Sequence, residues 1–297
     1  MILRLSNNCH ISKNNKFIYA VNLENFMKAT VIIAVVGLAA VISFNVAQGI
    51  PSLGVGFMYG NGRYFSDSDP IARGGRGYDK FWVEYALDIP KKRHESYPEI
   101  GKAKPADSWR CKECHGWDYM GTQGAYQSGL HFTGITGISA AQVQPVESVI
   151  GILKNNTHRY DAVLPPTALK DIAMFVVEGQ VDMQTMINDE TKTAIGDQNK
   201  GKKTYNNMCA DCHGLDGKTL NFSHDTAKYM GTVAVANPWE ALHKIRNGHP
   251  GAFIDHMAGR HTDRRSMGTH FMPPMRTKLS VEEQADLLSY IQSLPTQ

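Results

Sequence analysis

An excess of charge of either sign is absent from most of this chain. The 297 residues carry a formal charge of +3, and the part that follows residue 47 has 27 basic and 27 acidic side chains. Proteins that bind nucleic acid through its phosphates present a strongly basic surface, so we expect no nucleic-acid partner. The alternation of apolar and polar residues that marks a β-strand is also missing. The missing strand pattern favours an all-α fold, and the balanced charge favours a partner other than nucleic acid.

Long apolar runs are absent with one exception, residues 29–47. Read from Met27, this segment has a short basic start at Lys28, an apolar core and a small residue at its end, the pattern of an export signal. We therefore expect residues 27–47 to be a cleaved signal peptide, and residues 1–26 to precede the true start or to be disordered. A run of this length would also just span a bilayer, so a retained membrane anchor stays open as the alternative.

Cysteine is scarce, and its few positions form a pattern. Four of the five cysteines belong to two copies of Cys-x-x-Cys-His. The copies are Cys111-Lys-Glu-Cys114-His115 and Cys209-Ala-Asp-Cys212-His213. This spacing is the attachment signature of c-type haem. The two thiols form thioethers with the haem vinyl groups, and the histidine becomes the proximal iron ligand.

Other functions of Cys-x-x-Cys fit this chain less well. A structural zinc site needs four nitrogen or sulfur ligands in two close pairs, whereas these pairs lie 98 residues apart and each has its own histidine. A thioredoxin-like pair would follow a strand in a βαβ unit, and a disulfide between such near neighbours is rare. We therefore predict two covalently bound haem c groups.

The helical patterns divide the chain into segments. Residues 48–77 are rich in glycine and are predicted to be a flexible leader. Two haem domains follow, at 78–180 and 197–297, joined by a polar linker at 181–196. Apolar spacing, prolines and capping residues predict the helices, at 78–87, 145–154, 167–177, 197–205, 239–246 and from Ser280 to the C-terminal end.

The second domain resembles the class I cytochrome c family. In that family a glycine, an aromatic residue and the first haem cysteine recur four residues apart, as do Gly201, Tyr205 and Cys209 here. The resemblance implies that the glycine lets the last helix approach closely, through Leu287 and Tyr290. The family's sixth iron ligand is a methionine before a proline. Met272 takes that place, with Met275 as the fallback.

The first domain resembles the family less completely. Ala103 and Asp107 stand where the glycine and the aromatic residue are expected, so the helix pairing cannot be carried over. Leu164 stands where Met272 stands in the second domain, and leucine cannot bind iron. His158 is our first candidate for the sixth ligand and His131 is the runner-up. The remaining alternatives are Met120, Met174 and an open iron.

These features predict an exported, periplasmic dihaem cytochrome c that transfers single electrons between redox partners in a respiratory chain. Histidine ligation of the first haem would lower its potential below that of the Met-ligated second haem, which predicts a downhill step from domain one to domain two. One alternative is a dihaem oxidoreductase of the peroxidase or thiosulfate dehydrogenase type, with the catalytic haem in the first domain. Another is an anchored subunit of a membrane respiratory complex that retains residues 29–47.

One basic segment departs from the family pattern. It lies between His249 and Met272 and carries several basic residues, including Arg264 and Arg265. The simplest interpretation of this segment is a solvated loop, and our further hypothesis is a docking surface near the haem edge for an acidic redox partner, where charge would speed the encounter. A metal site formed by His256 and His261 is the weaker interpretation, because no supporting carboxylate or cysteine pattern accompanies them.

Overall fold

The computed structural model describes residues 56–59, 63–66, 69–223, 225–250 and 272–297. Ser52–Gln297 form one compact unit. The described residues do not include the predicted signal or anchor segment or Cys9. They also do not include the basic segment between His249 and Met272, which contains His256, His261, Arg264 and Arg265. Among the described residues, no helix combines the length and the apolar composition needed to cross a membrane.

The fold is all-α, as predicted, and the few strands among the described residues form two small hairpins. The helices are α2 (Pro70–Glu84), α3 (Cys111–His115), α4 (Val146–Lys154), α5 (Pro166–Met174), α6 (Gln198–Met208), α7 (Ala210–His213), α8 (Met230–Ala236), α9 (Pro238–Asn247) and α11 (Val281–Gln292). Phe175–Gly179 extends α5 as a π-helical turn, and short 3-10 turns lie at Asp107–Trp109, Gly129–His131, Ser139–Val143, Tyr160–Ala162 and Met183–Thr185. The antiparallel hairpins pair β1 (Gly56–Tyr59) with β2 (Arg63–Ser66) and β3 (Ile187–Asn188) with β4 (Thr193–Ala194).

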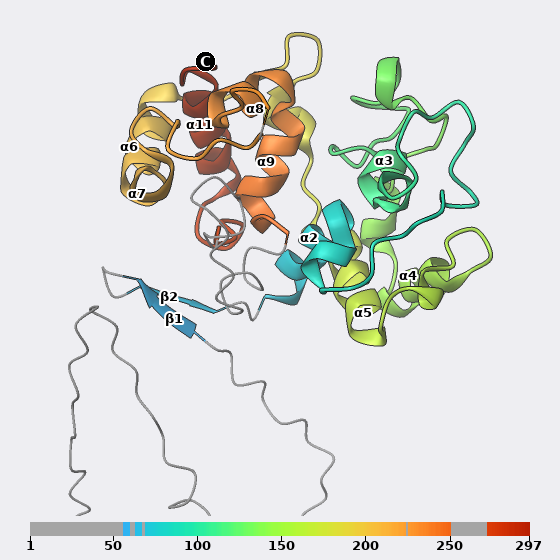
Figure 1. Ribbon diagram of the computed structural model, residues 1–297. Helices are drawn as coiled ribbons and strands as arrows, with labels where there is room; N and C mark the ends of the chain where they lie inside the picture. The colour runs from blue at the N-terminus through green and yellow to red at the C-terminus, as the bar shows by residue number, and fades with distance from the viewer. Residues whose placement is uncertain (1–55, 60–62, 67–68, 224, 251–271) are drawn as a thin grey trace, which may run out of the picture. The chain divides into compact units, whose positions relative to one another are not determined.

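The closest helix pairing joins α6 to the C-terminal α11, which lie side by side (Figure 1). A Cβ atom at Gly201 would lie 1.9 Å from the carbonyl oxygen of Asp286. Tyr205 packs against Tyr290 with ring centroids 5.2 Å apart. The predicted close approach is therefore confirmed. The predicted capping box is also present, since Ser280 and Glu283 exchange hydrogen bonds at the start of α11.

The same pairing exists in the first half of the chain, where we had predicted that it could not be carried over. A Cβ atom at Gly74 would lie 2.0 Å from the carbonyl oxygen of Asp171, so α2 and α5 meet as α6 and α11 do. Tyr78 follows Gly74 by four residues, as Tyr205 follows Gly201. The prediction failed because it looked for this pair directly before Cys111, whereas residues 85–110 separate the helix from the motif.

The predictions for the leader at 48–77 and for the linker at 181–196 are wrong in part. The glycine-rich leader cannot extend to residue 77, because Asp69 caps α2 and the helix begins at Pro70. Residues 181–196 do not form a free linker either. Met183, Met186 and Ile187 are each 1% exposed, and the side chain of Gln292 on α11 bonds the backbone of this segment at Lys192 and Ala194.

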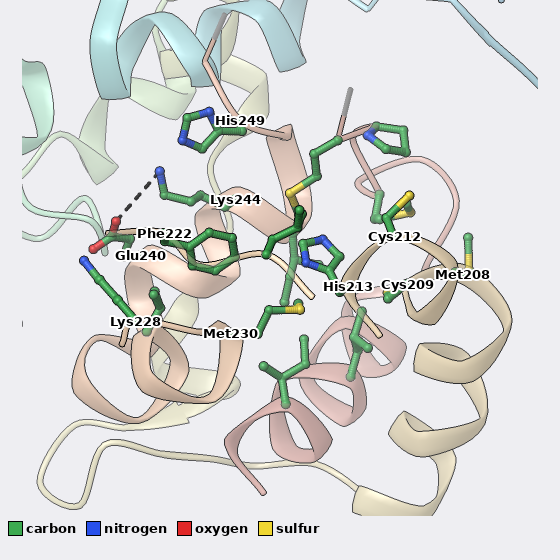
Figure 2. A pocket seen from close by; sticks show the side chains of 18 residues that line it. Met208, Cys209, Cys212, His213, Phe222, Lys228, Met230, Glu240, Lys244 and His249 are labelled. Atoms are coloured by element: carbon green, nitrogen blue, oxygen red, sulfur yellow. Dashed lines mark ion pairs between the residues drawn. The ribbon is translucent and has the colours of Figure 1, made fainter. Parts of the chain in front are cut away.

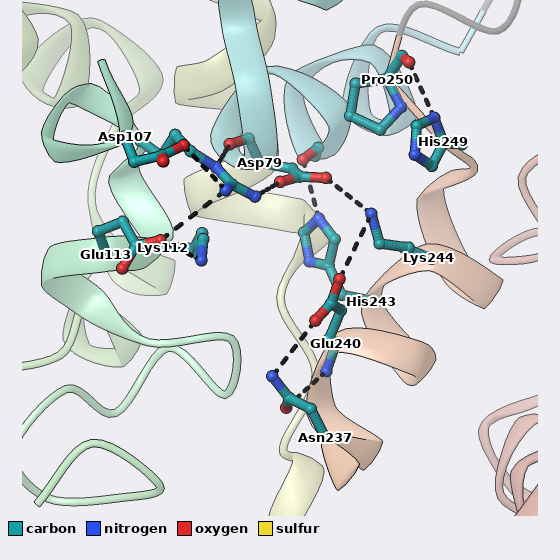
Figure 3. Close-up of polar contacts among 12 residues, drawn as sticks. Asp79, Asp107, Lys112, Glu113, Asn237, Glu240, His243, Lys244, His249 and Pro250 are labelled. Carbon is teal, nitrogen blue, oxygen red and sulfur yellow. Dashed lines mark hydrogen bonds and ion pairs between the residues drawn. The ribbon is translucent and has the colours of Figure 1, made fainter. Parts of the chain in front are cut away.

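A buried carboxylate joins the two halves of the unit (Figure 3). Asp79 on α2 is 2% exposed and forms ion pairs with Arg110, which precedes the first motif, and with Lys244 on α9. The Asp79–Lys244 distance is 3.1 Å. Burial alone would raise the pKa of Asp79, but Lys244 and Arg110 hold it well below the usual 3.8. The charged form is thus built into the packing of α2 against α9.

Gly201→Ala should destabilise the haem-loaded protein by about 2 kcal/mol, because the added methyl group overpacks the α6–α11 contact. Urea unfolding followed by circular dichroism measures this. Gly151→Ala is the matched control: no atom lies within 4 Å of its added Cβ, so a helical glycine gains up to about 1 kcal/mol. An unchanged midpoint for Gly201→Ala would contradict the close contact.

Asp79→Asn should cost about 3 kcal/mol at pH 7, because it leaves two cations without their buried partner. A carboxylate whose pKa is lower in the folded state stabilises the protein above its unfolded pKa of about 3.9, and this contribution is lost as pH falls below that value. The loss of stability below about pH 4 should therefore be smaller in Asp79→Asn than in the wild type. Asp107→Asn, at the more exposed partner of Arg110, should change stability by less than about 1 kcal/mol. Equal acid sensitivity of wild type and Asp79→Asn would refute the proposed role.

Candidate functional site

The second motif opens onto an apolar cavity with about 1160 Å³ of empty space, including the part open to solvent. We call it the second cavity. Figure 2 shows His213 pointing into it, with Cys209 and Cys212 on one side. Phe222, Met230 and residues of α9 and α11 complete the apolar wall. A mostly apolar lining with a few polar side chains is typical of a cofactor site.

The predicted sixth ligand, Met272, lines this same cavity together with His213. Pro273 lies beside it, and the fallback Met275 also lines the cavity. Met275 is fixed by its backbone N–H, which donates to the carbonyl oxygen of Ile245 at 3.0 Å. Gly248 on the neighbouring turn has φ +84°, and a Cβ there would lie 2.5 Å from the Met272 carbonyl oxygen. The structure thus brings together the second histidine and methionine predicted from the sequence.

Charged side chains lie on the side of the second cavity opposite the cysteines (Figure 2). These are Lys228, Glu240 and Lys244, and Glu240 pairs with Lys244 at 3.7 Å. His249 lies nearby, and burial lowers its pKa to about 3, so it is neutral. This side of the cavity is therefore suited to the polar, anionic end of an otherwise apolar ligand.

The first motif opens onto its own cavity, with about 1260 Å³ of empty space on the same measure. We call it the first cavity. Cys111, Cys114 and His115 line one side of it, and Tyr78 lies in its wall. Apolar side chains from α4, α5 and the loop after the motif make up most of the rest, namely Ile135, Ile138, Ala141, Val149, Ile152, Leu153, Ile172 and Val176.

His158 lies across the first cavity from His115. The ring centroids are 6.3 Å apart and the ring planes differ by 23°. Because metal–imidazole bonds are about 2 Å long, this separation has room for one metal ion between the rings. Burial lowers the pKa of both histidines, which favours the neutral form that binds metal.

The other candidates for the first cavity do not line it. His131 has a side chain that is 49% exposed, lies 3.5 Å from Glu113, and stacks on Tyr126. Met120 and Met174 are half-buried outside the cavity wall, and Leu164 is buried in the protein core. The geometry thus brings only one of the predicted sixth-ligand candidates to His115 among the described residues.

The local backbone after both motifs is the same. Tyr78 donates its hydroxyl hydrogen to the carbonyl oxygen of Gly116 at 2.7 Å, and Tyr205 donates to Gly214 at 2.6 Å. These glycines directly follow His115 and His213, and their φ angles are +83° and +81°. Only glycine adopts this conformation readily. The helix-one tyrosine therefore fixes the backbone that directly follows the motif histidine in each half.

The thiols have properties that disfavour thiol–disulfide chemistry. Burial raises the pKa of Cys111 to about 11 and of Cys209 to about 12, whereas a redox-reactive cysteine is a thiolate. All four cysteines of the motifs are free. In the described part of the chain, no three His, Cys, Asp or Glu side chains converge to hold a metal ion.

A buried contact lies between the two cavities. His243 on α9 has its ring centroid 5.8 Å from that of Tyr78, which lines the first cavity. Its neighbours Lys244 and Ile245 line the second cavity. Tyr119 donates to Nδ1 of His243, whose Nε2 donates to the carbonyl oxygen of Gly75, each at 2.9 Å. Burial lowers the pKa of His243 to about 4, so this link is uncharged.

Sequence reasoning missed three functional features. Gly74 and Tyr78 were detectable, because they repeat the Gly-x-x-x-Tyr spacing of Gly201 and Tyr205. His243 and His94, which lines the first cavity, stand in no recognisable pattern. Their positions depend on how separate helices and loops meet.

Among the comparisons with known proteins, the family match falls on the half of the chain that contains the second motif. The cytochrome c family model matches residues 198–295, a range that contains the second motif, Met272 and both helices of the α6–α11 pair. No curated protein and no solved structure matches the chain. A cytochrome c domain implies covalently bound haem c and a role in electron transfer. Residues 198–295 of this chain are a cytochrome c domain.

Proposed function

We propose that the protein is an exported dihaem cytochrome c that transfers single electrons between redox partners in a respiratory chain. The observation that carries this proposal is the repetition of one arrangement in both halves of the described chain. Each Cys-x-x-Cys-His motif opens onto an apolar cavity, and in each a helix-one tyrosine binds the glycine after the histidine. The second half is a cytochrome c domain, so the first half is inferred to bind haem c as well.

In the first cavity, His115 and His158 would hold the iron. Nδ1–H of His115 donates to the carbonyl oxygen of Thr136 at 2.8 Å. Nδ1 of His158 lies 3.2 Å from Oδ1 of Asn155, an acceptor. Both contacts leave Nε2 available for metal and orient the ring, as hydrogen bonds to the remote nitrogen do in other metal sites. Cys111 and Cys114 would form the thioethers.

In the second cavity, His213 and Met272 would be the iron ligands, and Cys209 and Cys212 the attachment points. Lys228 and Lys244 lie on the opposite side. Lys244 is already paired with Asp79 and Glu240, so Lys228 is the cation suited to neutralise a haem propionate, which would otherwise be costly to place near an apolar wall.

Haem c, when bound, supplies reversible one-electron oxidation and reduction at its iron. The protein's contribution is to exclude water with the apolar walls and to set the two potentials through different axial ligands. A neutral thioether raises the potential relative to a second histidine, so electrons would move from the first haem to the second. Tyr78, in the wall of the first cavity, and His243, next to Lys244 of the second cavity, form a buried ring contact between the two cavities.

Export to the periplasm and a redox-protein or membrane-complex partner complete the proposal. The alternative, a dihaem oxidoreductase, requires an exchangeable sixth position at the first haem. His158 facing His115 supports the carrier instead. An open first iron in the purified protein would reverse this preference.

Intact mass of the purified protein should show two covalent haems, and chain mass will show whether residues 1–47 are removed. Cys111→Ala/Cys114→Ala should leave only the second haem, and Cys209→Ala/Cys212→Ala only the first, because each cavity holds its own attachment pair. The remaining haem in each variant is identified by tryptic peptide mass. A single haem in the wild type, attached at Cys209 and Cys212, would end the dihaem proposal.

The axial ligands are tested by electron paramagnetic resonance and by carbon monoxide binding. The wild type should be low-spin at both haems, with a Met-to-iron charge-transfer band from one of them. His158→Ala should give a high-spin signal and carbon monoxide binding at the first haem, and Met272→Ala should give the same at the second haem. His131→Ala is the matched histidine control and should leave both haems low-spin. A low-spin first haem in His158→Ala would remove His158 as the ligand.

A further inference from the structure

Residues 85–110, which we call the insertion, separate helix one from the haem motif only in the first half of the chain. Tyr78 precedes Cys111 by 33 residues, whereas Tyr205 precedes Cys209 by four. The insertion lies against the segment Thr157–Arg159, which contains His158. We propose that the insertion is a positioning device that holds His158 at the first haem iron, with His94 and Ser96 as the residues that act on it. This inference rests on the proposed role of His158.

Consecutive residues of the insertion contact consecutive residues of the ligand segment. Nε2–H of His94 donates to the carbonyl oxygen of His158 at 2.9 Å. The hydroxyl of Ser96 donates to the carbonyl oxygen of Thr157 at 2.7 Å. Between them, Glu95 pairs with Arg159. The insertion therefore bonds to the backbone carbonyl groups of His158 and of the residue before it.

His94 is itself fixed on its other side. Its Nδ1 accepts a hydrogen bond from the backbone N–H of Ser96 at 3.1 Å, which assigns the proton to Nε2. Its backbone N–H donates to the hydroxyl of Ser108 at 2.8 Å, and its ring packs edge-on against Trp109 at 4.4 Å between centroids. His94 is 8% exposed. Because both ring nitrogens are engaged, His94 supports the cavity rather than competing for a metal ion in it.

The insertion thus connects the two sides of the first cavity. Ser108 and Trp109 lie just before Cys111, and the backbone carbonyl of Trp109 accepts the hydroxyl hydrogen of Tyr160 at 2.7 Å. The C-terminal end of the insertion leads directly into the haem attachment motif at Cys111. Its residues 94 and 96 are bonded to His158 and Thr157. The distance between proximal and distal histidines is set through it.

The ligand segment needs such support, because its backbone is strained. Arg159 has φ +51°, a left-handed conformation that is unfavourable for a residue with a side chain. Strained residues persist where the surrounding structure holds them. Without the bonds from His94 and Ser96, the segment could relax and carry His158 away from the iron.

The test measures how readily His158 leaves the iron. At saturating carbon monoxide, the rate of binding to the reduced first haem reports dissociation of the distal ligand. His94→Leu should raise that rate about tenfold, which corresponds to the loss of one part-buried hydrogen bond. Ser96→Ala should raise it about threefold, because its hydrogen bond to Thr157 is exposed and contributes less, and it serves if His94→Leu fails to incorporate haem.

Two matched variants separate positioning from general damage. His94→Gln keeps an amide donor that can reach the His158 carbonyl, and it should bring the rate to within about twofold of the wild type. Glu95→Gln alters the neighbouring residue, whose ion pair is exposed, with side chains 74% and 55% accessible for Glu95 and Arg159. Its rate should match the wild type, since exposed pairs contribute little.

The outcomes distinguish the two proposals. Wild-type rates in both His94→Leu and Ser96→Ala, with a first haem that opens in His158→Ala, would overturn the role of the insertion and leave His158 as the ligand. A first haem that stays closed in His158→Ala would overturn the ligand assignment itself. A fast rate in His94→Leu that His94→Gln restores would establish the positioning role.

Discussion

Backbone contact between the first and last helices is the constraint on which each half of this structure depends. A Cβ at Gly74 would lie 2.0 Å from the carbonyl oxygen of Asp171, and one at Gly201 would lie 1.9 Å from that of Asp286. No other residue type permits so close a crossing. The contact fixes helix one, and the tyrosine four residues later then reaches the glycine carbonyl behind the proximal histidine. The packing of the two helices therefore also fixes the backbone next to the motif histidine.

The two halves build different sites on this shared frame. In the second half, helix one leads directly into the motif, and a methionine lines the far wall of the cavity. In the first half, the insertion intervenes and a histidine occupies the far wall. The methionine loop is bonded to the end of α9 through the Met275 N–H and the Ile245 carbonyl oxygen, whereas His158 lies in a strained segment bonded to residues 94–96. The proposed role of the insertion would allow a different iron ligand in the first half while the helix packing stays the same.

The halves also meet through a buried polar and aromatic contact. Asp79 pairs with Lys244 across the α2–α9 contact, and Arg76 donates to the carbonyl oxygen of Asn247 at 2.9 Å. His243 packs beside Tyr78 in the same region. Since buried charges are stable only when paired and hydrogen-bonded, these contacts favour one arrangement of α2 on α9. In the proposed dihaem protein, these contacts would hold one cavity in a fixed position relative to the other.

The sequence by itself determined the chemistry and most of the second half. The cysteines and histidines of both motifs, Met272, the capping box at Ser280 and the Gly201–Tyr205 pair are local patterns, and local spacing is enough to interpret them. Only the tertiary structure decided what depends on distant contacts. It assigned Gly74 and Tyr78 to helix one despite the insertion, and it brought His158 rather than His131 to the first cavity. The reason is physical: no local spacing encodes which loop will face His115, because that follows from hydrogen bonds between residues 94–96 and 157–159, which are about 60 positions apart in the chain.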